Sequence, residues 1–537
     1  MSNKTSIIHA SLALIFSITA FASLTYAGGP SGADPFPRGN YAYAPRELIV
    51  RFASKPDGTP RSFGEQKTIL DAINGGTVID SVRLVSGLTL IQLPPDVSVE
   101  KALPTFKSTP GLLYAHPNYL CTGAATFPND PRFDQQWGLH NTGQEIHGPN
   151  GNWNGTPDSD IDAPEAWDIQ NNASDIVIAV IDSGIDYTHP DLAANIWINP
   201  GEDQQPFGII GPEDWNRIDD DGNGYEDDIC GFDFCRWGQV RDSDPMDAHG
   251  HGTHVSGIAG AIGNNNVGVA GVCWNVEIMP VRWLNDQNVG GVWDAIASID
   301  YAVFMGATVL NCSWVADDNL DPQVRQALLD EIQEAGENGV LVVAASGNDG
   351  RNADIQPRYP AGFPLENIIS VMATDGDDLR SWWPWWNTSS NWGAVSVDLA
   401  APGTDILSCV PPAVRQGNLY EYWSGTSMAT PFVAGACALV WQANPQLSHL
   451  DVKQLILASV DHIPILAGLS VTGGRLNLDK ALALATDSCL PICHPDYDDW
   501  VLLGRPDCWC TPYQCDGDAD VSDSGFPAYF RVYTGDL

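Results

Sequence analysis

Three short stretches of the sequence carry side chains that together could activate a hydroxyl group as a nucleophile. Asp182 ends an apolar run and precedes a Ser-Gly turn, where a carboxylate leaving a buried strand can orient a histidine. His251 stands at the start of an expected helix, in the string HGHGTHVSGIAG. Ser427 opens a second expected helix, in SGTSMATPFVAG, whose positive end stabilises an anion beside the serine. An acid, a base and a hydroxyl of this kind catalyse acyl transfer through a covalent intermediate.

A fourth residue could supply the electrostatic part of that chemistry. The apolar run GVLVVAAS (339–346) breaks at Gly347, and Asn348 then offers a side-chain N–H at the carboxyl end of a strand. An amide in this position can donate a hydrogen bond to the oxyanion that develops on a carbonyl group.

Each of these residues, taken alone, has a commoner structural explanation. Asp182 and Asn348 are ordinary turn residues, and Ser427 is an ordinary helix cap. His251 alone could be a surface histidine, and His254, one turn further on, is better suited to a structural role. Their order along the chain, Asp before His before Ser, favours catalysis. Unrelated folds that use these three groups for catalysis place them in three different orders along the chain, and this is one of the three.

The elements that must position these residues alternate between strands and helices. Nearly continuous apolar runs indicate strands buried on both faces at 175–182, 276–283, 308–314, 339–346, 367–373 and 396–403. Helices are expected between strands, for example at 292–305 and 322–337. This order predicts an α/β fold with a doubly wound, mainly parallel sheet and helices on both faces. Catalytic residues of such a sheet lie at the carboxyl ends of its strands.

Three further parts of the chain precede this pattern. Residues 1–27 have the charged start, apolar run and small residues of a secretory signal peptide, with cleavage expected near Ala27 or alternatively near Ala22. Residues 28–44 are rich in Gly and Pro and indicate a linker. Residues 45–120 predict a small α+β domain. Its expected strands are 47–52 and 87–94, and its expected helices are 65–74 and 99–107.

Composition limits the partners of this 537-residue chain. Its 67 acidic and 25 basic residues give a net charge of −42, which argues against nucleic acid and anionic membrane surfaces as partners. The acidic excess favours solubility and cation binding. Outside the signal peptide no apolar run is long enough for a membrane span, so we expect a secreted, extracellular protein. We also expect this protein to be a monomer.

Five of the 12 cysteines lie close together in residues 487–537, which we expect to form a Cys- and Asp-rich C-terminal module. Export favours disulfide bonds, with a zinc site as the alternative, and connectivity cannot be deduced from sequence. The string CDGDADVSDSG (515–525) resembles a dockerin-like calcium repeat that is truncated.

At the residues that carry chemistry, the chain closely resembles the subtilisin family of serine peptidases. The matching strings, in family order, are VIDSGIDYTHPDL (180–192), HGTHVSG (251–257), AASGNDG (344–350), YPA (359–361), APG (401–403) and GTSMATPFVAG (425–435). The resemblance covers roughly 128–486 and implies a subtilisin-like peptidase domain over 121–486. It implies Ser427 as nucleophile, His251 as general base and Asp182 as the orienting acid. Asn348 and the Ser427 backbone N–H would be the oxyanion donors.

The same resemblance implies an inhibitor and a substrate-binding strand. Residues 45–120 resemble the family's inhibitory propeptide, which would assist folding and be cleaved soon after Tyr119. The substrate, a protein or peptide, would add as a strand along TVLNCSW (308–314). The substrate-binding residues implied in this way are Ser313, Trp314, Val315, Ala345, Ser346 and Gly347.

Two positions depart from the family pattern. Val315 stands where subtilases usually carry glycine. Arg358 stands before YPA, where a small residue often forms the floor of the specificity pocket. We expect Arg358 to bind substrate and to favour acidic side chains.

Ca²⁺ is the expected cofactor, because three groups of oxygen-bearing residues suit a hard cation. The first resembles the strong calcium site of thermitase-like subtilases: Asp130, Asp191 and Asn265, with the carbonyl groups of Ile262, Val267 and Val269. The second, in IDDDGNGYEDD (218–228), has the one-three-five spacing of a calcium loop but no Glu at position 12: Asp219, Asp221, Asn223 and Asp228. The third resembles a weaker calcium site of related enzymes: Asp233, Asp242, Asp244 and Asp247.

The sequence thus predicts a secreted serine endopeptidase with its own propeptide as intramolecular inhibitor. Two other functions stay open: a catalytically idle scaffold or adhesion protein on a peptidase fold, and a different hydrolase such as an esterase. The tryptophans of SWWPWWN (381–387) could pack in a loop or core, or form a surface platform.

Overall fold

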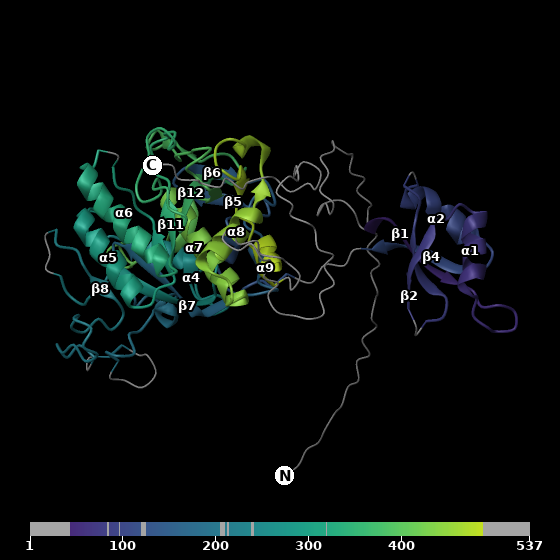
Figure 1. The fold of residues 1–537 in the computed structure, drawn as a ribbon, viewed down its shortest axis with the longest axis horizontal. Helices are drawn as coiled ribbons and strands as arrows, with labels where there is room; N and C mark the ends of the chain where they lie inside the picture. The colour runs from purple at the N-terminus through teal and green to yellow at the C-terminus, as the bar shows by residue number, and fades with distance from the viewer. Residues whose placement is uncertain are drawn as a thin grey trace, which may run out of the picture. The chain divides into compact units, whose positions relative to one another are not determined.

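The structure, a computed structural model, describes residues 43–82, 85–95, 97–119, 125–203, 210–211, 214–237, 241–317 and 319–486. The chain divides into two compact units, Met1–Thr122 and Gly123–Leu537 (Figure 1). The expected signal peptide, nearly all of the expected linker and the C-terminal module lie outside the described residues.

The first unit is a small α+β domain, as the sequence predicts. Its antiparallel sheet has the strand order β2-β3-β1-β4, formed by β1 (Tyr43–Phe52), β2 (Thr77–Ser81), β3 (Leu88–Gln92) and β4 (Leu112–Tyr119). Its helices are α1 (Phe63–Ala72) and α2 (Val99–Ser108). Ser62 and Glu65 form a capping box that begins α1. Leu48, Val50, Leu70 and Phe106 belong to a core of this unit's own.

The second unit is built on a nine-stranded sheet with the order β18-β19-β15-β12-β11-β10-β7-β9-β8. All its pairs are parallel except β18 with β19. Its six principal strands are those the sequence predicts: β7 (Asn172–Asp182), β9 (Asn275–Arg282), β10 (Val309–Cys312), β11 (Leu341–Ala345), β12 (Ile368–Thr374) and β15 (Leu399–Pro402). The other three are β8 (Phe232–Asp233), β18 (Asp461–His462) and β19 (Gly474–Arg475).

Helices cover both faces of this sheet, which confirms the doubly wound arrangement. Along β7, Ile178 and Val180 join one apolar core, and Ala179 and Ile181 join another. Because successive strand residues point to opposite faces, these two cores lie on opposite sides of the sheet. The first contains residues of α4 (His251–Gly260) and α7 (Thr426–Ala443); the second contains residues of α5 (Val292–Phe304) and α6 (Pro322–Glu337) (Figure 1).

Shorter elements complete the second unit. The helices are α3 (Ala163–Ala166), α8 (His449–Ala458) and α9 (Leu478–Thr486). The paired strands are β5 (Glu145–Gly148) with β6 (Gly151–Asn154), β13 (Trp382–Trp383) with β14 (Thr388–Ser389), and β16 (Ile406–Cys409) with β17 (Tyr420–Trp423). Over the described ranges, none of the helices has the length and apolar character needed to cross a bilayer.

The cysteines of the described residues form no disulfide bond. Cys230, Cys235, Cys273, Cys312, Cys409 and Cys437 are all buried free thiols. The disulfides expected from export are therefore not found there. The remaining six cysteines, Cys121 and the five of the C-terminal module, lie outside the described residues.

Candidate active site

A buried carboxylate and a histidine meet where β7 ends and α4 begins. Asp182 is 0% exposed, and its Oδ1 lies 2.7 Å from His251 Nδ1. Asp182 Oδ1 also accepts a hydrogen bond from the Ser183 backbone N–H at 2.7 Å. Gly252 lets the start of α4 lie against the turn that follows Asp182, because a Cβ atom on Gly252 would lie 2.1 Å from the Gly184 carbonyl oxygen. The acid and the base are therefore fixed by the end of a central strand and the first turn of a helix.

The pairing changes the proton affinity of the imidazole. Burial acts to lower the pKa of His251, but the charge of Asp182 and the hydrogen bond to it outweigh burial and raise the pKa above its ordinary value of 6.5. Asp247 contributes in the same direction. The geometry assigns His251 Nδ1 to Asp182, which leaves Nε2 for a reacting group.

Asp247, which the sequence analysis places in the third expected calcium group, holds the start of α4 in place. Its Oδ1 accepts hydrogen bonds from Ser183 Oγ and from the backbone N–H groups of His249 and Gly250 at 2.7–2.9 Å. Its Oδ2 accepts from the backbone N–H and hydroxyl of Thr253 at 3.0 and 2.7 Å. Both oxygens are thus engaged with the protein itself.

Ser427 lies in the first turn of α7, and its hydroxyl is held by a neighbouring backbone carbonyl. Ser427 Oγ donates to the Ser313 carbonyl oxygen at 3.0 Å, and Ser313 Oγ donates to the Ser427 carbonyl oxygen at 2.9 Å. Ser313 follows β10, which pairs in parallel with β7, so it leaves the sheet at the edge where Asp182 lies. Among the described residues, the Ser427 hydroxyl makes no hydrogen bond to His251.

Two hydrogen-bond donors lie near one point beside Ser427. The Asn348 amide oxygen accepts from the Thr426 backbone N–H at 2.9 Å and from its hydroxyl at 3.0 Å, and Nδ2 donates to no other group of the described residues. A Cβ atom on Gly425 would lie 3.5 Å from Asn348 Nδ2 and 3.7 Å from the Ser427 backbone nitrogen. Gly425 has φ +150° and no side chain, so this point stays open. The arrangement suits an oxyanion.

An aromatic ring that the sequence did not single out lies among the histidines. The Trp423 ring centroid is 6.1 Å from that of His251, and the ring stacks on His254 at 4.8 Å. His254 is fully buried beside two carbonyl groups, and burial lowers its pKa to about 3. This neutral, enclosed imidazole fits the structural role expected for it. Arg415 covers the Trp423 ring at 4.7 Å.

Arg358 is buried and paired, in contrast to the open cation expected from the sequence. Its guanidinium lies 2.8 Å from Asp349 and 2.8 Å from Asp317. Its stem passes beside the site, since a Cβ atom on Gly347 would lie 3.2 Å from Arg358 Cγ. The guanidinium is therefore already paired with carboxylates of the chain itself.

The other residues expected to bind substrate differ in their exposure and in whether their backbone groups are already hydrogen-bonded. Val315 is 42% exposed, whereas Ser313, Trp314 and Ala345 are buried. The Ser346 backbone N–H donates to Val371, and its carbonyl accepts from Asn391. The Gly347 N–H donates to Thr426 Oγ1, and its carbonyl accepts from Asn391. The chain itself therefore uses the backbone groups of 346–347.

The first expected calcium group converges from three segments. The backbone N–H groups of Asn264 and Asn265 donate to Asp130, and Asn265 Nδ2 donates to Asp191 Oδ1 at 2.8 Å. Burial raises the pKa of Asp191 to about 6 and also raises that of Asp130. Ile262, Val267 and Val269 belong to the same loop, and the Val269 N–H donates to Asp191 Oδ2. This set of hard oxygen atoms fits calcium.

The third expected group does not assemble around one point in the described structure. Asp233 lies 3.1 Å from Arg282, Asp242 accepts from the Asp244 backbone N–H, and Asp244 accepts from the Tyr187 hydroxyl. Burial raises the pKa of Asp233 to about 7 against the effect of Arg282.

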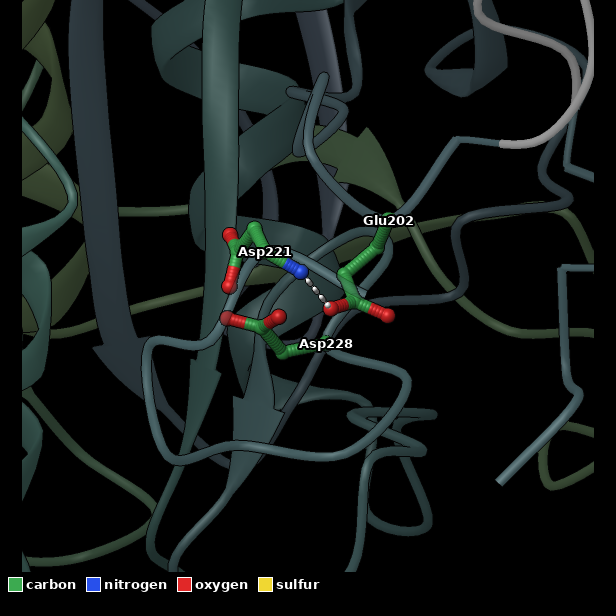
Figure 2. Close-up of side chains that lie close together, drawn as sticks. All are labelled: Glu202, Asp221 and Asp228. Carbon is green, nitrogen blue, oxygen red and sulfur yellow. Dashed lines mark hydrogen bonds between the residues drawn. The ribbon is translucent and has the colours of Figure 1, made fainter. Parts of the chain in front are cut away.

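The second expected group is regrouped. Asp221 and Asp228 come together with Glu202, which the sequence did not single out (Figure 2). Asp219 instead accepts hydrogen bonds from the backbone N–H groups of Gly222, Asn223 and Gly224. Asn223 Nδ2 donates to both Asp221 and Asp228.

Comparison with known proteins identifies the larger unit. The sequence profile of the subtilase family matches residues 173–482, and the profile of the fervidolysin N-terminal prodomain matches residues 33–118. The chain belongs to the subtilase family. It is therefore a subtilisin-like serine peptidase with an N-terminal prodomain, as the sequence resemblance implies.

Curated relatives of this subtilase extend over both units. A thermophilic serine proteinase of a Bacillus species is 32% identical over 442 residues, which cover 82% of this chain and 88% of that protein. Thermitase of Thermoactinomyces vulgaris is 34% identical, covering 66% of this chain and 99% of thermitase. Subtilisin-like protease 1 of Plasmodium falciparum is also 34% identical, but this chain covers 44% of it.

A solved structure agrees with the fold of this subtilase. A protease from Pseudoalteromonas arctica superposes with a TM-score of 0.51 and 26% identity, covering 67% of this chain and all of that one. The mainly parallel sheet with helices is therefore the subtilisin-like fold.

Proposed function

We propose that this subtilase is a secreted endopeptidase whose catalytic triad is Asp182, His251 and Ser427. The observation that carries the proposal is the 2.7 Å hydrogen bond from His251 Nδ1 to the buried Asp182, at the sheet edge where Ser313 holds Ser427. In this mechanism Asp182 keeps the imidazole in the tautomer that presents Nε2 as a base. His251 then takes the Ser427 proton as the hydroxyl attacks the substrate carbonyl.

Substrate binding itself would release the nucleophile. A peptide that adds as a strand along 313–315 brings backbone N–H groups to that segment. One of them can take over the Ser313 carbonyl, which now accepts from Ser427 Oγ. Rotation about the Cα–Cβ bond of Ser427 would then turn the hydroxyl toward His251, since catalytic hydrogen bonds often form only with substrate present.

The oxyanion would rest between Asn348 Nδ2 and the Ser427 backbone N–H. Both donors are preorganised, one by Thr426 and one by the first turn of α7, so they need no rearrangement as charge develops. His251 then passes its proton to the leaving amine. Water, deprotonated by His251, releases the acyl group from Ser427.

We propose that the smaller unit inhibits this site until it is cleaved off. Residues 45–120 would act as an intramolecular inhibitor that is cleaved soon after Tyr119. The protein would act outside the cell as a monomer on proteins and peptides, and its charge of −42 argues against nucleic acid as a partner.

A structural calcium ion is part of the proposal. Asp130, Asp191 and Asn265 would hold it, with the carbonyl groups of Ile262, Val267 and Val269. Its contribution would be to neutralise two buried carboxylates and fasten the loop 262–269. The catalytic steps above involve only the protein and water.

Hydrolysis of casein by the purified protein, compared with its Ser427→Ala variant, tests this function. We expect the variant to lose activity on casein while keeping the circular dichroism spectrum of the unchanged protein. Turnover of a matched amide and ester pair separates the peptidase from an esterase. Casein hydrolysis that persists in the Ser427→Ala variant would contradict the triad.

A further inference from the structure

The loop that carries Asn348 is bounded by two glycines in strained backbone conformations. Gly347 has φ +105° and Gly350 has φ +70°, values that other residues rarely adopt. Thr426 fixes the amide oxygen of Asn348, but this contact does not fix the path of the backbone. An oxyanion donor must lie about 2.7–3.1 Å from the charge that it stabilises. The backbone of this loop therefore needs a support of its own.

The side chain of Asn391 supplies such a support. Asn391 is 0% exposed, and its Oδ1 accepts hydrogen bonds from the backbone N–H groups of Asp349 and Arg351 at 3.0 and 2.9 Å. Its Nδ2 donates to the Ser346 carbonyl oxygen at 2.9 Å. One amide group thus binds the backbone on both sides of Asn348, and both ends of this amide are used.

The backbone next to this amide adds further contacts to the same loop. The Asn391 N–H donates to the Gly347 carbonyl oxygen at 2.8 Å. The Thr388 hydroxyl donates to the carbonyl oxygen of Asn348 itself at 2.5 Å. A Cβ atom on Gly347 would lie 2.5 Å from Asn391 Nδ2, so glycine is needed there for the two segments to meet.

Asn391 is itself fastened to the central sheet through the preceding residue. Ser390 Oγ accepts from the backbone N–H of Ala373, on β12, at 2.9 Å and donates to the Asn391 carbonyl oxygen at 2.9 Å. The Ser390 N–H donates to the Ser381 carbonyl oxygen at 3.0 Å. β12 is buried along its whole length in the sheet (Figure 1). The position of the loop 346–351 is therefore set by the sheet, with Asn391 as the link.

We propose that Asn391 is a positioning residue for the oxyanion donor Asn348. The inference rests on the proposed function, because it assigns a role within that catalytic site. Asn391 is fully buried and does not touch the substrate; it holds the loop 346–351 where Asn348 Nδ2 reaches the oxyanion. A misplacement of about 1 Å can cost on the order of 10²-fold in rate. Loss of the Asn391 amide therefore lowers kcat and leaves substrate binding largely unchanged.

A double-mutant cycle tests the proposal. We measure kcat and KM on one peptide amide substrate for the unchanged protein, Asn391→Ala, Asn348→Ala and the double variant. Asn391→Ala is expected to lose about tenfold or more in kcat, with KM changed by less than about threefold. The double variant should be no slower than Asn348→Ala, because no amide donor is then left to position.

Asn367→Ala is the matched control for the loss of a buried amide. Asn367 is 4% exposed, and its Nδ2 donates to the carbonyl groups of Ile332 and Val340, away from the loop 346–351. This variant should lower the Tm, as Asn391→Ala does, but leave kcat unchanged. Asn391→Ser leaves a polar group in the vacated space and replaces Asn391→Ala in the cycle if the alanine variant does not fold.

Two further measurements distinguish positioning from a general loosening of the site. The acid-side midpoint of the pH–rate profile should stay in place in Asn391→Ala, because the pairing of His251 with Asp182 is untouched. Affinity for a peptide aldehyde, which forms a tetrahedral adduct with the serine, should fall by about the same factor as kcat.

The possible failures of this inference and of the proposed function differ. Equal kcat values for Asn391→Ala and Asn367→Ala would overturn the inference and leave the proposed function in place. Losses that multiply in the double variant would also overturn it, because Asn391 would then act independently of Asn348. Unchanged kcat in Asn348→Ala would remove the donor, and with it the role of Asn391. A protein that does not hydrolyse casein would contradict the proposed function itself and the inference with it.

Discussion

In the proposed mechanism, the charge on Asp182 sets the pH range in which His251 can act as a base. Asp182 raises the pKa of His251 above 6.5 although burial opposes this, and only the neutral imidazole accepts a proton. We therefore expect kcat/KM to fall on the acid side with a midpoint above 6.5. Asp182→Asn removes the raising charge, so the midpoint should move to lower pH while kcat falls by about 10⁴-fold. A pH–rate profile of both proteins checks this, and a midpoint that stays in place in the variant would contradict it.

We predict that Arg358 limits which side chain fits before the scissile bond. Sequence alone made it a partner for acidic substrates, but the guanidinium is already paired with Asp317 and Asp349. An acidic substrate side chain would have to compete with these two carboxylates for the guanidinium, so we expect such substrates to be cleaved poorly. Arg358→Gly removes the stem beside Gly347 and should raise kcat/KM for large apolar side chains by about tenfold. Profiling both proteins with a peptide library measures it.

The outcome of that profiling separates the two readings of Arg358. Preferred cleavage after Asp or Glu by the unchanged protein would restore the sequence-based expectation. Equal profiles for the unchanged protein and Arg358→Gly would remove Arg358 from the specificity site. Arg351→Gly, the same change on the loop that follows Asn348, is the control.

What the sequence predicts for single residues depends on how local the signal is. Asp182, His251, Ser427 and Asn348 each stand in a short string that also fixes their element, so the expected placement agrees with the structure. Glu202 gives no such signal, because 18 residues separate it from Asp220, whose backbone N–H it meets. The partners of Arg358 are likewise set by tertiary contacts, which spacing along the chain does not encode.

At the scale of elements, loops held by buried carboxylates should respond to metal and to pH. In the folded protein the pKa of Asp191 is about 6, above its ordinary value of 3.8. Without calcium, the folded state thus binds more protons than the unfolded state between about pH 4 and 6, and stability falls as pH rises through this window. With calcium bound to ionised carboxylates, the dependence reverses. EDTA is therefore expected to lower the Tm strongly at pH 7.5 and little at pH 5.

Differential scanning calorimetry of the Ser427→Ala variant, with CaCl₂ or EDTA, measures this difference. Asp191→Asn should remove most of the calcium-dependent shift that belongs to the loop 262–269. A Tm that EDTA leaves unchanged at pH 7.5 would contradict a stabilising role for this ion.

Elements were predictable where burial on both faces leaves a continuous apolar run. β11 and β12 are buried along their whole length, and their sequences show it. Short partners such as β2 and β13 were not expected, because β2 is largely exposed and β13 has two residues.

The tryptophans of 381–387, for which the sequence left core packing and a surface position open, lie in and around the hairpin of β13 and β14. Trp383 is buried, whereas Trp382, Trp385 and Trp386 are 57–76% exposed, so most of them lie on the surface.

At the scale of the whole molecule, the chain is two folded units with separate cores. The smaller unit packs Leu48 and Phe106 in a core of its own, and the larger unit packs its two cores on its own sheet. Cleavage of the chain between the units therefore breaks neither core. We therefore expect that the smaller unit can be removed without unfolding the larger one, as a precursor with an inhibitory propeptide would require.

Self-cleavage of the precursor follows from combining the proposed triad with this division. We expect the secreted wild-type chain to lose residues up to a point soon after Tyr119, and the Ser427→Ala chain to keep them after the signal peptide is removed near Ala27. Intact mass and N-terminal sequencing of both secreted proteins measure this directly. Because only the hydroxyl differs between them, a cut present in one and absent in the other assigns the peptidase as its own processor. The same cut in both chains would instead assign processing to another peptidase, and activity of an uncut wild-type chain would remove the smaller unit from the role of inhibitor.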